Sequence, residues 1–69
     1  MSIREWIENA KKEGKAQMFV IYANIGNNAD ELIVCESNEA DAHNCEIVDV
    51  YYIEHSENLR TAVITAEVK

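Results

Sequence analysis

The stretch that decides the fold of this 69-residue chain is IVDVYYI, residues 47–53. Its length and its β-branched and aromatic content predict a strand. Because successive side chains of a strand point to opposite faces, this strand is apolar on both: Val48, Val50 and Tyr52 on one, Ile47, Tyr51 and Ile53 on the other. Such a strand needs cover on both sides of its sheet.

A helix is predicted at about residues 3–13. Ser2 and Glu5 have the spacing of a capping box, and Gly14 can adopt the left-handed conformation that ends a helix. Four apolar residues fall at i, i+3, i+4 and i+7: Ile3, Trp6, Ile7 and Ala10. This spacing gives the helix one apolar face.

The remaining elements are predicted from strand-forming runs and turn residues. Strands are expected at residues 17–25, 31–36, 46–54 and 59–68, with a short helix at 37–44 and a hairpin linker at 55–58. The short helical segment has fewer residues than a parallel crossover normally requires, so the strands flanking it are expected to be antiparallel. The prediction is one α+β domain over residues 1–69, with the N-terminal amphipathic helix packed on a small, mainly antiparallel four-stranded sheet.

Only one predicted helix is long enough to cover a sheet. We expect it on the face with Phe19, Ile21, Val50, Tyr52 and Ile64, inserting Trp6 and Ile7. The opposite face is then expected to carry six apolar residues: Val20, Tyr22, Ile47, Tyr51, Ile53 and Val63. Burying these would contribute on the order of 10 kcal/mol, comparable to the stability of a typical domain, about 5–15 kcal/mol.

This uncovered face predicts a homodimer or a complex with a partner protein. The alternative is self-coverage, in which the sheet curls or the short helix folds back over the exposed side.

Charge is segregated along the chain. The net charge is -7, and between Ala16 and Leu59 there are nine acidic residues and no Lys or Arg. Direct binding to nucleic acid or to an anionic membrane is disfavoured, since both need basic side chains. The field instead favours a partner protein with a basic surface; the alternative is that the acidity only maintains solubility.

The N-terminus lacks the apolar segment of a signal peptide, and no apolar run is long enough to span a bilayer. A cytoplasmic location is therefore expected. Cys35 and Cys45 fit that compartment as free thiols, with a single disulfide as the alternative.

No catalytic motif is present, and no enzyme activity or cofactor is expected. Cys35, His43, Cys45 and His55 are residue types that bind zinc, but their spacing is not that of a zinc site. The acidic group Glu36, Glu39 and Asp41 with His43 lacks the glycine-containing loop of a calcium site. A pocket of about 300 Å³ or more is also not expected in so small a chain.

The leading hypothesis is a non-catalytic binding protein, an inhibitor or modulator that presents carboxylates to a basic site on its partner, including a site that binds nucleic acid. Small acidic inhibitors of phages and mobile elements resemble it in class only. The acidic residues expected to contact the partner are Asp30, Glu31, Glu36, Glu39, Asp41, Glu54 and Glu57. One alternative is a structural or regulatory homodimer that uses its apolar sheet face, with incidental acidity; another is a small metal-binding protein using Cys and His.

Overall fold

A computed structural model describes residues 1–28 and 30–69. The described elements follow one another as α1 (Ile3–Lys12), β1 (Met18–Ala23), β2 (Ile33–Cys35), α2 (Ser37–Ala42), β3 (Cys45–Ser56) and β4 (Leu59–Val68). Their strands form one sheet in the order β2-β1-β4-β3, in which β1 and β4 are parallel and the other neighbours are antiparallel. The predicted α+β fold, with a mainly antiparallel four-stranded sheet, is confirmed.

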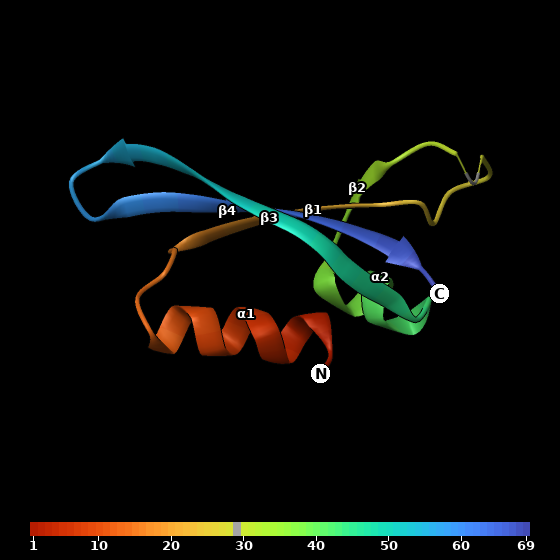
Figure 1. Ribbon diagram of the computed structural model, residues 1–69, viewed down its shortest axis with the longest axis horizontal. Helices are drawn as coiled ribbons and strands as arrows, with labels where there is room; N and C mark the ends of the chain where they lie inside the picture. The colour runs from red at the N-terminus through yellow and green to blue at the C-terminus, as the bar shows by residue number, and fades with distance from the viewer. Residues whose placement is uncertain (29) are drawn as a thin grey trace.

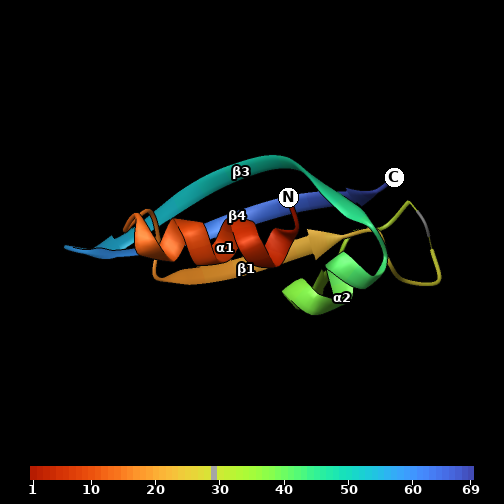
Figure 2. The same cartoon turned by 90° about the horizontal axis from the view of Figure 1, so that it is seen from below.

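Both helices lie on the same side of the sheet (Figure 1), and the view from below shows them in front of it (Figure 2). α1 starts as expected, because Ser2 Oγ accepts a hydrogen bond from the Glu5 amide at 3.1 Å. It ends at Lys12, and Gly14 follows in the left-handed region with φ of 71°. This backbone conformation favours glycine.

The core lies between the helices and the facing side of the sheet. Ile3 of α1 and Ile64 of β4 are its largest fully buried side chains, and Trp6 meets Phe19 edge to face with ring centroids 6.4 Å apart. Alanines occupy the closest approaches: Ala23, Ala40, Ala62 and Ala66 have no exposed surface. The helix therefore covers the face that the sequence predicted, including Phe19, Ile21, Val50 and Ile64.

The strands flanking α2 do not follow the prediction. β2 and β3 both run opposite to the parallel pair β1 and β4, so they point the same way, at opposite edges of the sheet. The 3 residues of β2 advance the chain by about 10 Å, and the 6 residues of α2 span about 9 Å. Because β2 is so short, a helix of this length is enough to bring the chain back, and β3 can then start in the same direction as β2. The expectation of antiparallel flanking strands was therefore wrong.

A bulge corrects the predicted alternation along β3. Ile47 lies opposite Ala66 and Asp49 opposite Thr65, so Val48 is an extra residue. Ile47 consequently shares the helix-covered face with Ala66 and packs against the core. Its assignment to the uncovered face was wrong, because strict alternation cannot anticipate a bulge.

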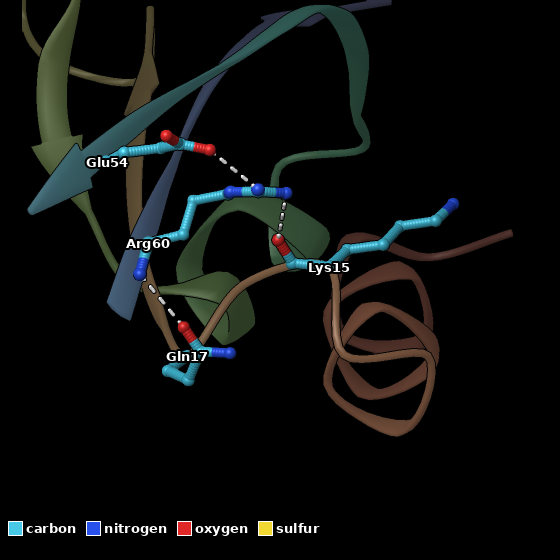
Figure 3. Close-up of polar contacts among 4 residues, drawn as sticks. All are labelled: Lys15, Gln17, Glu54 and Arg60. Atoms are coloured by element: carbon cyan, nitrogen blue, oxygen red, sulfur yellow. Dashed lines mark hydrogen bonds and ion pairs between the residues drawn. The ribbon is translucent and has the colours of Figure 1, made fainter. Parts of the chain in front are cut away.

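The β3–β4 hairpin is longer than predicted. The strands continue to Ser56 and from Leu59, leaving Glu57 and Asn58 as the turn, with Asn58 at φ of 68°. At its base the Arg60 guanidinium pairs with the Glu54 carboxylate at 2.7 Å and donates to the Lys15 carbonyl at 3.4 Å (Figure 3). These contacts tie the hairpin to the segment between α1 and β1.

Asp41 of α2 holds the start of α1. Its two carboxylate oxygens accept hydrogen bonds from the backbone amides of Ile3 at 2.8 Å and Arg4 at 3.1 Å. First-turn amides have no partner within their helix, and a negative charge there is favourable. A residue predicted to contact a partner thus has a structural role.

Replacing this carboxylate should destabilise the fold. We expect Asp41→Ala to lower the free energy of unfolding by about 1–2 kcal/mol, the usual effect of losing a helix cap. Urea denaturation followed by circular dichroism measures it. Glu39→Ala, at an exposed position of the same helix, is the control and should change stability by about 0.5 kcal/mol or less. Equal losses would contradict the anchoring role.

Candidate binding surface

One side of the sheet carries neither helix (Figures 1 and 2), and we call it the open face. Strand register identifies its residues, because directly paired residues point to the same side. Val34, Tyr22, Thr65 and Asp49 form one row across the sheet. The next rows are Val20, Val63 and Tyr51, then Met18, Thr61 and Ile53.

The open face is apolar at its centre and largely accessible. Val63 is only 5% exposed, because strands flank it on both sides, whereas Tyr51 is 53% exposed and Ile53 43%. Neither α2 nor curling of the sheet covers these side chains. Self-coverage, the alternative considered from the sequence, is therefore not found in the described residues.

Register places most of the predicted apolar residues on this face. Val20, Tyr22, Tyr51, Ile53 and Val63 lie on it, and Ile47 does not. Sequence reasoning missed Met18 and Val34, which are 45% and 63% exposed. Met18 could have been predicted, because the alternation of residues 17–25 places it on the same side as Val20. The side on which Val34 lies follows from its pairing with Tyr22, and this pairing has no local sequence signal.

Polar groups on the open face lie toward its ends. The Nε2 atom of His55 lies 2.7 Å from Oγ1 of Thr61, a hydrogen bond whose donor depends on the histidine tautomer. It satisfies the hydroxyl of Thr61, which is buried. Asp49 pairs across the sheet with Thr65, and Glu46 with Glu67.

Of the basic residues that the structure describes, only Lys69 reaches the open face. Arg4, Lys11 and Lys12 belong to α1, and Lys15 follows that helix. Arg60 points to the helix side, and Lys69 pairs with Glu46 at 3.0 Å at the end of the described chain. The segregation seen along the sequence is therefore largely a segregation between the two sides of the sheet, because five of the six basic residues lie off the open face.

The seven predicted acidic contact residues do not form one surface. They fall in three places: Asp30 and Glu31 between β1 and β2, Glu36, Glu39 and Asp41 at α2, and Glu54 and Glu57 at the β3–β4 hairpin. The hairpin and the β1–β2 connection are at opposite ends of the molecule, whose longest extent is 38 Å (Figure 1). Their role in binding stays a prediction.

Cys35 and Cys45 are free thiols that pack against the core. The pKa of the Cys35 thiol is raised, mainly by burial and further by the nearby Glu39 and Cys45. The pKa of the Cys45 thiol is also raised, mainly by burial and further by Asp41. Both are therefore held in the protonated form, which is the poor nucleophile. Within residues 1–28 and 30–69, no three His, Cys, Asp or Glu side chains are grouped so as to hold a metal ion.

Surface hollows are larger than the sequence suggested. One of about 480 Å³ lies beside the β3–β4 hairpin, lined by Lys15, Glu54 and Arg60 among others. The expectation of no hollow above about 300 Å³ was therefore wrong. The cations that line this hollow already form ion pairs, Arg60 with Glu54 and Lys15 with Glu13, the latter at 3.0 Å.

The chain has no significant match to a family model, to a curated protein or to a solved structure. Neither α1 nor α2, the helices of the described residues, is long and apolar enough to cross a bilayer.

The raised pKa of the two thiols predicts slow alkylation. We expect iodoacetamide to modify the folded protein with a pH midpoint above that of the same chain in urea, because only the thiolate reacts. Since the folded pKa is above the unfolded one, the associated stability is complete below the unfolded pKa and is lost as pH rises through the folded pKa. Rate measurements between about pH 7 and 11 test this. Identical midpoints would contradict it.

Proposed function

We propose that this protein is a non-catalytic binding protein that docks on a partner protein through its open face. The main observation in support of this proposal is the contiguous set of exposed apolar side chains on that face. Tyr51 is 53% exposed and Ile53 is 43% exposed, and both lie beside the buried Val63. Contiguous apolar surface of this kind marks interaction sites in soluble proteins. Tyrosine is well suited to an interface, since it offers a large contact area.

Charge supports a partner with an apolar centre and basic surroundings. The chain has a net charge of -7. Within the described residues, the open face has Asp49, Glu46 and Glu67 toward one end, and its one cation is Lys69, which pairs with Glu46. Such a field attracts a basic partner and speeds its association. Where the partner's basic surface is a nucleic-acid-binding site, occupying it would make this protein an inhibitor or modulator.

The proposal places this protein in the cytoplasm. The two free thiols support a reducing compartment, since small secreted domains usually carry a disulfide framework.

Site-specific photocrosslinking tests which side of the protein meets the partner. Benzoylphenylalanine at position 51 of the open face should form adducts in a lysate of the source cells, and the same group at position 8, exposed on α1, should not. Adducts from both positions in equal yield, or from position 8 alone, would contradict docking through the open face. An adduct of twice the 7.8 kDa chain mass would instead indicate a second copy.

Substitution should separate binding from stability. We expect Ile53→Asp to weaken partner binding by at least about tenfold while lowering the unfolding free energy by less than about 1 kcal/mol, because the side chain is 43% exposed. The matched change Leu32→Asp, at a 42% exposed position outside the strands, is the control. Titration at low and moderate salt should show weaker binding as salt rises. If the affinity for the partner did not change with salt, the apolar open face alone would account for binding.

A homodimer is the second candidate function, favoured by the same exposed apolar face. Two copies packed face to face would bury Tyr51 and Ile53 of both, but would bring their acidic residues together while Lys69 of each copy is already paired with Glu46. Sedimentation equilibrium separates the two candidates. We expect a monomer at low micromolar concentration; a dimer that Tyr51→Ala dissociates would establish the structural or regulatory module.

A further inference from the structure

β3 is an unusually long edge strand. It has 12 residues and pairs only with β4 in the described structure, and nothing lies beyond its outer edge (Figure 2). An average strand has about 5–6 residues. The other edge strand, β2, has 3 residues and offers little to pair with.

The middle of β3 is regular. Between the irregularities near Val48 and His55, residues 49–54 pair one to one with residues 60–65 of β4. In a regular strand, alternate residues direct their amide and carbonyl groups away from the existing neighbour. β3 therefore presents a row of unused backbone hydrogen-bonding groups along its outer edge.

The regular part of this edge, residues 49–54, lacks two of the residues that most often block strand addition, Lys and Pro. Proteins usually protect edges with Lys, Pro or short strands, and β3 contains neither Lys, Arg nor Pro. It carries Glu46, Asp49 and Glu54 instead. A second β3 strand would bring the same negative charges to the edge, whereas a basic strand would neutralise them.

We propose that the outer edge of β3 binds an extended, basic segment of another protein, which joins the sheet as a fifth strand. Main-chain hydrogen bonds would supply affinity, as in other cases of strand addition. Lys or Arg side chains of the segment would lie beside Asp49, and apolar ones beside Tyr51 and Ile53, which share the same side of the sheet. This site is the strand edge, which adjoins the open face at Tyr51 and Ile53 but uses the backbone of β3 instead of that face.

Designed peptides test the proposal. The probe is a ten-residue strand-forming peptide with Lys and then Val along one side and Thr along the other, so that Lys can lie beside Asp49 and Val beside Tyr51 and Ile53. It is compared with one peptide in which Glu replaces Lys and one in which alternate Val residues are N-methylated. In NMR titrations of the isotope-labelled protein, the Lys peptide should perturb residues 49–54 and slow the exchange of their outward amides. It should bind at least about tenfold more tightly than either comparison peptide at low salt.

A matched pair of variants tests the role of charge. Asp49→Lys should weaken binding of the Lys peptide at least about fivefold, whereas Glu8→Lys, a matching charge reversal at an exposed position of α1, should have little effect. If Asp49→Lys fails to fold, the comparison of the three peptides with the unmodified protein still tests the proposal. Absence of amide protection in β3, equal binding of the Lys and Glu peptides, or protection only by self-association would overturn the proposal. None of these outcomes bears on crosslinking from the open face.

Discussion

The structure depends on one apolar contact layer, formed where both helices pack against a single side of the sheet. Ile3 and Ile64 fill it, and the alanines of β1, β4 and α2 let the backbones approach closely. The described chain has no third helix with which to cover the other side of the sheet. The helix that crosses from β2 to β3 also uses this side, and the opposite side is left to solvent. The candidate binding surface thus follows from how the core is built.

The same arrangement separates charge. Because α1 carries three of the six cations and Lys15 follows it, the side of the molecule with the helices is mixed in sign. The open face has carboxylates and, among its described residues, only Lys69 as a cation, which pairs with Glu46. Electrostatic attraction and apolar contact therefore favour the same orientation of a basic partner. The acidic residues are also spread along the longest direction of the molecule, so they act through the overall field more than through one row of contacts.

Local signals in the sequence predicted the elements well, and long-range pairing explains the errors. The capping residues and apolar face of α1, the positions of four strands and the face that contains Phe19, Ile21 and Ile64 were all predictable from residues close together in the chain. The bulge at Val48 depends on how β3 pairs with β4, and the face of the sheet on which Val34 lies depends on how β2 pairs with β1. Local sequence patterns do not identify these strand partners. The structural role of Asp41 was missed for the same reason, because its partners are 37 and 38 residues away.

The parallel pairing of β1 with β4 has a consequence for folding. Met18 pairs with Thr61, so the centre of the sheet joins the first strand to the last one of the fold, and each of the outer strands depends on that central pair. A topology dominated by such distant contacts folds slowly compared with a helical bundle of equal size. During synthesis β1 and β3 would lack the neighbour that joins them until β4 left the ribosome. Nascent chains would therefore stay exposed to proteases and chaperones until translation had passed the final strand.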